Sequence, residues 1–164
     1  MLSPRTPRTA LRWWWPALAV LATDLITKQW ALAGLRMHEP LVLTSYFNLT
    51  LTRNTGAAFS FLSGAGGWQR WLLAALAAVV SLLIVAWLRR LGPEDRTTAL
   101  ALSLILGGAL GNLWDRLFSG AVIDFLVVHY EEWYWPAFNV ADAAISVGAV
   151  LLVLLTLRDG GPTR

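Results

Sequence analysis

The chain has 164 residues, of which 57% are hydrophobic and only 14% are charged. A soluble domain usually carries about a quarter of its residues as charges, so this composition indicates a protein that folds in lipid. The absence of cysteine excludes disulfides, iron–sulfur clusters and thiol catalysis, and the net charge of +3 comes from scattered arginines rather than from a basic patch for nucleic acid.

Four apolar runs are each long enough to cross a bilayer, which takes about 20 residues in a helix. They are residues 13–35, 68–88, 97–117 and 138–157. The first run also resembles a cleavable signal peptide, because Arg5, Arg8 and Arg12 precede it. It continues beyond Asp24 and Lys28, however, and this length favours a spanning helix. We therefore expect an all-α membrane protein, a single integral membrane domain with four transmembrane helices.

The distribution of arginine predicts how these helices are oriented. Arginines precede the first run, flank the turn between the second and third runs, and follow the last run. Residues 118–137 contain acids but neither lysine nor arginine. Because cytoplasmic loops carry the excess of basic residues, we expect both termini in the cytoplasm. Residues 36–67 and 118–137 then form an outer loop and an outer segment.

The outer loop has strand-like sequence at residues 41–52, which are rich in β-branched and aromatic side chains and partly alternate in polarity. This pattern predicts a short strand pair, and hence a small extracytoplasmic β-sheet between the first and second helices. Residues 63–67 are rich in glycine and predict a hinge that leads into the second helix.

Ionisable residues inside apolar runs are costly, and they are often functional. Asp24 and Lys28 are four residues apart, so they share a helix face and can pair. Such a pair either ties the helix to the bundle or belongs to a functional site. Asn112, Asp115 and Arg116 also share one face near the outer end of the third run. Here the alternatives are an arginine that reaches the interface with a local carboxylate partner, or a functional cluster.

Glycines Gly107, Gly108 and Gly111 lie just before that cluster in the third run. Small residues at this spacing let another helix approach closely, so they predict a packing surface.

Two further acids leave their roles open at this stage. Asp124 lies among apolar residues just past the third run, so it either faces water from a loop or has a raised pKa. Asp142 follows Asn139 by three residues, which resembles a capping box at the start of the fourth helix. The alternative is that two of these carboxyls meet and share one proton. Such a pair provides one acid and one base, which is how aspartic proteases activate water.

Five short blocks carry most of these polar residues. They are DLITK at residues 24–28, NTGAAFS at 54–60, GNLWDR at 111–116, VIDF at 122–125 and FNVADA at 138–143. Each block alone is weak, but all five in this order, placed in this way against the four apolar runs, are highly specific. Over essentially its whole length the chain resembles the bacterial lipoprotein signal peptidases (signal peptidase II), which are four-helix aspartic proteases of the inner membrane.

The resemblance implies that Asp124 and Asp142 are a catalytic pair. The family cleaves prolipoproteins before a cysteine that bears a diacylglyceryl group, at the outer leaflet of the bacterial inner (cytoplasmic) membrane. It uses no metal and no cofactor, its partners are the prolipoprotein and membrane lipid, and globomycin inhibits it. The implied substrate-binding and supporting residues are Asn54, Gly56, Asn112, Asp115, Arg116, Asn139, Asp24 and Lys28.

Two other classes of protein compete with this interpretation. A small proton-linked transporter or channel subunit would use the acids as a relay, but the inner halves of the later helices offer few polar steps. A structural membrane partner would use the polar groups only to hold helices together.

Overall fold

The computed structural model describes residues 13–56 and 66–159. The helices are α2 (Trp14–Gly34), α3 (Trp68–Leu88), α4 (Arg96–Phe118) and α5 (Val140–Asp159), and the strands are β1 (Leu41–Thr44), β2 (Phe47–Asn54), β3 (Val122–Tyr130) and β4 (Trp133–Tyr134). These four helices occupy the four apolar runs. It stays a prediction that all four cross a membrane. The arginines at 5, 8, 12 and 164, residues 57–60 of the second block, and residues 63–65 of the predicted hinge lie outside the described residues.

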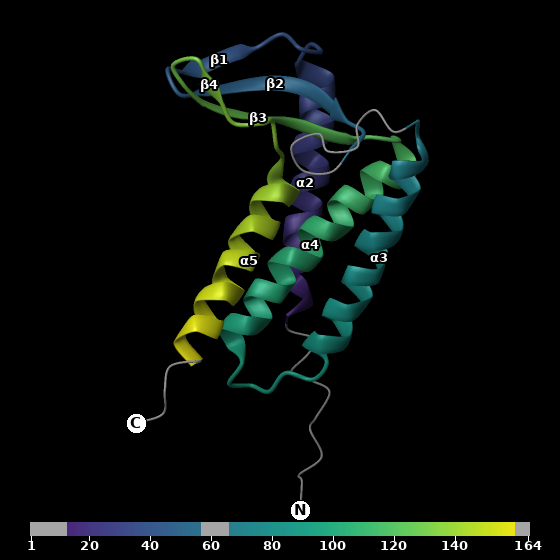
Figure 1. Ribbon diagram of the computed structural model, residues 1–164, viewed down its shortest axis with the longest axis vertical. Helices are drawn as coiled ribbons and strands as arrows, with labels where there is room; N and C mark the ends of the chain where they lie inside the picture. Colours follow the sequence, from purple (N-terminus) through teal and green to yellow (C-terminus); the bar gives the residue numbers. More distant parts are fainter. Residues whose placement is uncertain (1–12, 57–65, 160–164) are drawn as a thin grey trace, which may run out of the picture.

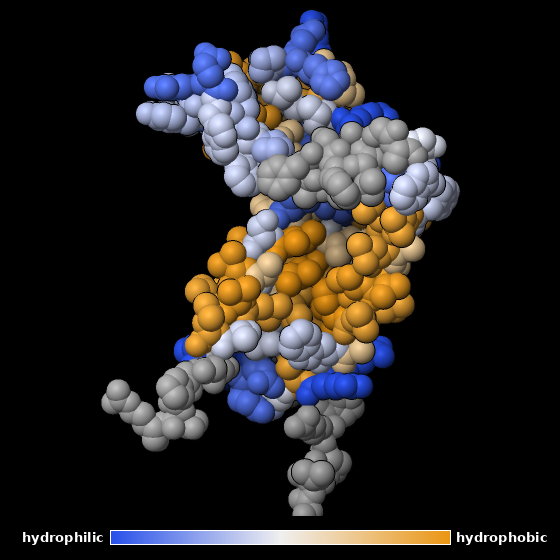
Figure 2. Space-filling model, in the orientation of Figure 1, coloured by the Kyte–Doolittle hydropathy of each residue, from blue (hydrophilic) through white to orange (hydrophobic). Residues whose placement is uncertain are grey.

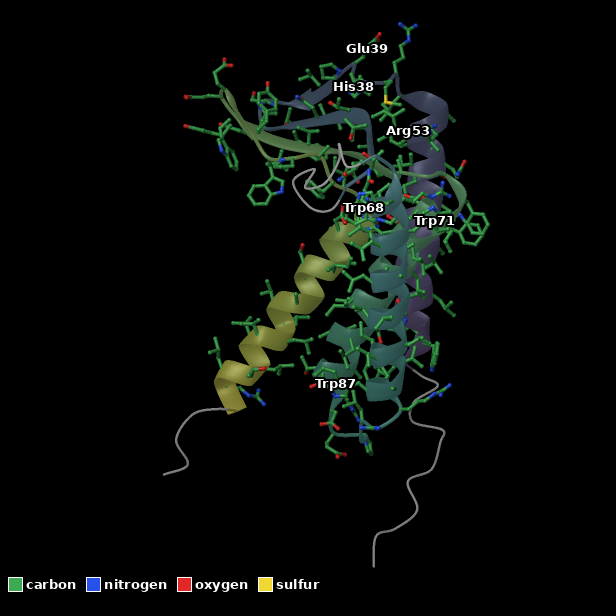
Figure 3. All side chains as sticks on the ribbon, turned by 45° about the vertical axis from the view of Figure 1, so that its right-hand side comes forward. His38, Glu39, Arg53, Trp68, Trp71 and Trp87 are labelled. Carbon is green, nitrogen blue, oxygen red and sulfur yellow. The ribbon has the colours of Figure 1, made fainter. Side chains whose placement is uncertain are left out.

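The helices have the surface of a membrane protein. Among the described residues, α3, α4 and α5 are long and apolar enough to cross a bilayer. On the face drawn in Figure 2, hydrophobic residues form a band across the helices, with hydrophilic residues at both ends. Trp68 and Trp71 lie at the sheet end of α3 and Trp87 at its opposite end (Figure 3). Tryptophan prefers the two interfaces of a membrane, so its position marks the borders of this band.

Helix α4 packs against each of the other three helices (Figure 1). A Cβ atom on Gly107 would lie 2.6 Å from the Ala17 carbonyl oxygen of α2, and one on Gly108 would collide with the Ala141 carbonyl oxygen of α5. Only glycine lets both helices come this close, so the predicted packing surface is confirmed.

The sheet lies beyond one end of the bundle (Figure 1), and its strand order is β1-β2-β3-β4, antiparallel throughout. The predicted strand pair is present as β1 and β2. The prediction was wrong in confining the sheet to the connection between the first two helices, since β3 and β4 come from residues 118–137. The first four residues of β3 are all buried, so this strand lacks the alternation that marks a half-exposed strand. In the β2 and β3 register Thr52 lies opposite Asp124, and β3 contacts α2 and α4 of the bundle.

Candidate active site

A buried charge network, which we call the hub, joins α2 to α4 beneath the sheet. Lys28 Nζ lies 2.6 Å from an Asp24 carboxylate oxygen and 2.8 Å from one of Asp115, and it donates a hydrogen bond of 3.2 Å to Asn112 Oδ1. All four residues are buried. The predicted pair of Asp24 and Lys28 is confirmed, but it is not self-contained, because Asp115 shares the lysine.

The hub also holds the backbone of the two elements that carry the other acids. Asp24 Oδ1 accepts a hydrogen bond of 2.9 Å from the Ala141 N–H, and Asp115 Oδ2 accepts one of 3.1 Å from the Ile123 N–H. Ala141 directly precedes Asp142, and Ile123 directly precedes Asp124. Each hub carboxylate therefore fixes the chain one residue before a candidate catalytic acid.

Arg116 does not pair with its neighbour Asp115. Its Nη1 donates to the Asn112 carbonyl oxygen at 3.2 Å, and its Nη2 donates to the Gly56 carbonyl oxygen at 3.1 Å. The Gly56 N–H in turn donates to Asn54 Oδ1 at 2.9 Å. The alternative of an arginine with a local carboxylate partner is therefore wrong, because the Asp115 carboxylate lies with Lys28 in the hub.

A cavity of about 800 Å³ brings five of the predicted site residues together. Asn54, Asn112, Arg116, Asp124 and Asp142 all line it. His38 and Arg53, which Figure 3 labels at the sheet end of the molecule, line it as well. The remaining predicted residues are not among the lining residues. Lys28, Asn139 and Gly56 contact lining residues directly, and Asp24 and Asp115 bind the backbone one residue before Asp142 and Asp124.

Amide side chains hold the two cavity aspartates. Asn112 Nδ2 donates to Asp142 Oδ1 at 2.7 Å, and Asn139 Nδ2 donates to Asp124 Oδ1 at the same distance. Asn54 Nδ2 donates to the other oxygen of Asp124 at 3.3 Å. The orientation of Asn112 is determined by chemistry, because turning its amide over would place an NH₂ group against the Lys28 ammonium.

Asn139 also caps α5, since its Oδ1 accepts a hydrogen bond of 2.9 Å from the Asp142 N–H. This is one half of the predicted capping box. The Asp142 carboxylate is occupied elsewhere, because it accepts from Asn112 and lines the cavity. Asp142 is thus not simply a helix cap.

Asp124 lies on β3 with only 2% of its surface exposed, so it is not a loop residue that faces water. Burial raises the pKa of Asp124 to about 7, and the charge of Asp142 acts in the same direction. Hydrogen bonds from Asn54 and Asn139 and the charge of Lys28 oppose this shift in pKa. The two acids therefore influence each other across the cavity, and Asp124 is able to hold or release a proton near neutral pH.

Sequence reasoning missed Arg70, which caps the end of α4 from α3. Its Nε donates to the Arg116 carbonyl oxygen and its Nη2 to that of Leu117 at 2.8 Å, while the guanidinium lies 4.7 Å from the centre of the Trp71 ring. Nothing in the local sequence marks this contact, because the two ends of it are 46 residues apart.

In the described part of the chain, no group of three or more histidine, aspartate or glutamate side chains could hold a metal ion.

The chain is similar to known proteins in sequence and in fold. Residues 16–158 match the family model described as Signal peptidase (SPase) II. A lipoprotein signal peptidase of Teredinibacter turnerae is 56% identical over 144 residues, which cover 88% of this chain and 86% of the relative. That of Pseudomonas putida is 53% identical over 146 residues, with 88% and 85% covered.

Two solved structures, both described as bacterial membrane enzymes, have the same fold. One has a TM-score of 0.84 at 25% identity and covers 100% of this chain and 96% of its own. The other has a TM-score of 0.78 at 26% identity, with 97% and 99% covered. Because the family model spans nearly the whole chain and relatives share more than half of their residues with it, this protein belongs to the signal peptidase II family of membrane proteases.

Proposed function

We propose that this protein removes the signal peptide from prolipoproteins, and that Asp124 and Asp142 are the catalytic pair that cleaves before the diacylglyceryl-modified cysteine. The observation that supports this most directly is the pair itself. Both carboxyls line one cavity, each accepts an amide hydrogen bond of 2.7 Å, and the pKa of Asp124 is raised to about 7. Two interacting carboxyls with one proton between them can act as acid and base together.

The proposed reaction needs one water molecule and the singly protonated pair. The ionised aspartate takes a proton from the water as the water oxygen attacks the scissile carbonyl carbon, and the protonated aspartate gives its proton to the carbonyl oxygen. The tetrahedral intermediate then collapses: one of its hydroxyl groups returns a proton to the ionised aspartate, the C–N bond breaks, and the leaving nitrogen takes the proton held by the other aspartate. The signal peptide leaves with a new carboxyl group, and the lipid-bearing cysteine gains a free amino group.

Arg116 is proposed to bind the substrate backbone. Two of its five N–H donors are used on the Asn112 and Gly56 carbonyl oxygens, which hold the guanidinium at the cavity wall. No described residue accepts from the remaining donors, and we propose that they bind carbonyl oxygens of an extended substrate. Asn54, Asn112 and Asn139 orient the carboxyls, and the hub residues Asp24, Lys28 and Asp115 support the chain behind them.

We further propose that four helices cross the bacterial inner membrane, with both termini in the cytoplasm and the cavity at the outer leaflet. Helix α2 carries Asp24 and Lys28, which lowers its average hydropathy, but both side chains are buried inside the bundle. Its outward face is mainly apolar, since Trp15, Leu18, Ile26 and Trp30 are each more than half exposed, although Thr23 and Gln29 are exposed too. A helix with this pattern presents a lipid-compatible face despite its charges.

Cysteine labelling tests this topology, because the chain contains no cysteine that would give a background signal. Glu132→Cys lies beside the β3 and β4 turn, and Glu94→Cys lies between α3 and α4. In spheroplasts, a membrane-impermeant thiol reagent should label Glu132→Cys directly and Glu94→Cys only after permeabilisation. The reverse pattern would contradict the proposed orientation.

The decisive test of function is cleavage of a purified lipid-modified precursor by Asp124→Asn and Asp142→Asn. Each variant keeps the shape of the side chain but removes the acid. Because the two acids act together, losing either one should lower turnover at least about a thousandfold. Glu94→Gln, a matched change outside the cavity, should keep full activity. Globomycin should inhibit the unaltered enzyme.

Circular dichroism and thermal unfolding in detergent should show both asparagine variants to be folded. Normal cleavage by either variant would disprove the catalytic pair. Poor folding of both variants would favour the purely structural interpretation of these acids.

A further inference from the structure

Ser146 is the polar side chain that lines the cavity on the membrane side of Asp142. It lies on α5 one helical turn beyond Asp142, which corresponds to a distance of about 6 Å along the helix, farther from the sheet. Its neighbours Ile145 and Val147 also line the cavity and are apolar. The serine is exposed, so the cavity continues from the two acids down the side of α5.

The Ser146 hydroxyl has no hydrogen-bond partner among the described residues. Thr23, Thr97 and Thr98 also lack one, but of these four hydroxyls only that of Ser146 lines the cavity. Ser81, Ser103 and Thr156 each donate to the carbonyl oxygen four residues earlier, at 2.7 to 2.9 Å. Such a back-bond is the usual solution for a hydroxyl in an apolar helix. A hydroxyl left without it in lipid carries a desolvation cost until a ligand satisfies it.

We propose that Ser146 is a substrate-binding residue that donates a hydrogen bond to an ester carbonyl of the diacylglyceryl group. This inference rests on the proposed function. It adds that the enzyme recognises the ester group of the lipid through Ser146. The serine touches lipid rather than the scissile bond, so it contributes to binding and specificity rather than to the chemical step.

The ester carbonyl is favoured by the chemistry of the groups that reach this depth. In a helical signal peptide inside the bilayer, backbone carbonyls are already bonded within the helix. Acyl chains have no acceptor. The ester oxygens lie where the glyceryl group meets the hydrocarbon, and they remain free to accept a hydrogen bond. The Ser146 hydroxyl lies one helical turn below Asp142, beside two apolar side chains. This position suits the boundary between the glyceryl group and the hydrocarbon of the acyl chains.

The test compares two synthetic precursor lipopeptides that differ only in the lipid linkage, one with ester-linked acyl chains and one with ether-linked alkyl chains. Both are cleaved by the full-length enzyme and by Ser146→Ala in the same detergent. For the ester precursor, Ser146→Ala should raise KM by about 2- to 10-fold, the value of one neutral hydrogen bond, with kcat almost unchanged. For the ether precursor, the unaltered enzyme should already show the raised KM, and Ser146→Ala should add nothing.

Thr156→Val is the matched control, because the Thr156 hydroxyl donates to the Leu152 carbonyl oxygen on the same helix. It should leave KM unchanged for both precursors. An equal KM for Ser146→Ala and the unaltered enzyme on the ester precursor would overturn the inference, and so would an equal penalty on both precursors. If the unaltered enzyme cleaves neither precursor, the proposed function fails instead, so the two failures are distinguishable.

Discussion

The hub and the cavity are neighbouring polar regions that treat their charges in opposite ways. In the hub, Asp24 and Asp115 share the ammonium of Lys28 at 2.6 and 2.8 Å, and all three side chains are almost fully buried. In the cavity, Asp124 and Asp142 accept hydrogen bonds from neutral amides, at 2.7 Å each. An amide orients a carboxylate without cancelling its charge. An ammonium ion orients the carboxylate and also offsets its charge.

The difference separates structural from chemical work. The Lys28 ammonium in the hub holds two carboxylates in place, which suits groups that accept hydrogen bonds from the backbone N–H donors of Ala141 and Ile123. In the cavity, burial and then the charge of Asp142 raise the pKa of Asp124 to about 7. A carboxyl that takes up and releases protons during catalysis at neutral pH needs a pKa close to 7, as Asp124 has. Asn112 connects the regions, because it accepts from Lys28 and donates to Asp142.

The largest expected effect on stability comes from breaking the hub with Lys28→Met. The change leaves two buried carboxylates without their cation, and losing one partner of a buried ion pair costs about 3 to 5 kcal/mol. We expect a marked fall in the thermal unfolding temperature in detergent, together with loss of activity. Asp142→Asn should lower activity while it leaves the unfolding temperature nearly unchanged.

A combined variant gives the control for this prediction. Adding Asp24→Asn and Asp115→Asn to Lys28→Met removes the uncompensated charges, so part of the lost stability should return. An unfolding temperature of Lys28→Met equal to that of the unaltered protein would show that the hub is not the structural element described above.

An intermediate effect is expected from Asn112→Ala, which cuts the connection between the regions. Asp142 loses its donor and Lys28 loses an acceptor, and an unsatisfied buried polar group costs about 1 to 3 kcal/mol. Both unfolding temperature and kcat should therefore fall, the unfolding temperature by less than in Lys28→Met and kcat by less than in Asp142→Asn. If kcat alone fell, Asn112 would belong only to the cavity, and if stability alone fell, it would belong only to the hub.

Local spacing rules predicted the parts of this arrangement that lie within one helix. The pair of Asp24 and Lys28, the glycine surface of α4 and the cap from Asn139 all follow from residues within four positions of each other. Such rules cannot predict contacts between residues that are far apart in the sequence. The sharing of Lys28 with Asp115 and the capping of α4 by Arg70 depend on how helices are placed side by side.

Strand β3 shows a second limit of sequence reasoning. Burial on both faces removes alternation, so residues 122–125 resembled an irregular apolar segment. The pairing of Asp124 with Asp142 could not be derived from spacing, and the expectation came from family resemblance. Both carboxyls line one cavity, and their catalytic role stays a prediction until the asparagine variants are assayed.

The smallest expected effect concerns pH and the amide of Asn54. Because the pKa of Asp124 is raised from 3.8 to about 7, the folded protein keeps a proton that the unfolded chain has lost between these values. The contribution of this group to stability is therefore present below about pH 4 and is lost as the pH rises through about 7. The pair of Asp124 and Asp142 should lose its one proton over the same pH range, so kcat should decline as the pH rises through about 7.

Asn54→Ala removes a donor that favours the ionised form of Asp124, and the pKa of that carboxyl should rise further. The alkaline decline in kcat should then move to higher pH, by less than about one pH unit, since a single neutral hydrogen bond is lost. Thr52→Val is a suitable comparison, because the Thr52 hydroxyl donates to the backbone carbonyl oxygen of Asp124 and not to its carboxylate. A shift to lower pH in Asn54→Ala, or an equal shift in Thr52→Val, would show that this amide does not tune the acid, and the contrast between amide-held and cation-held carboxylates would lose its chemical meaning.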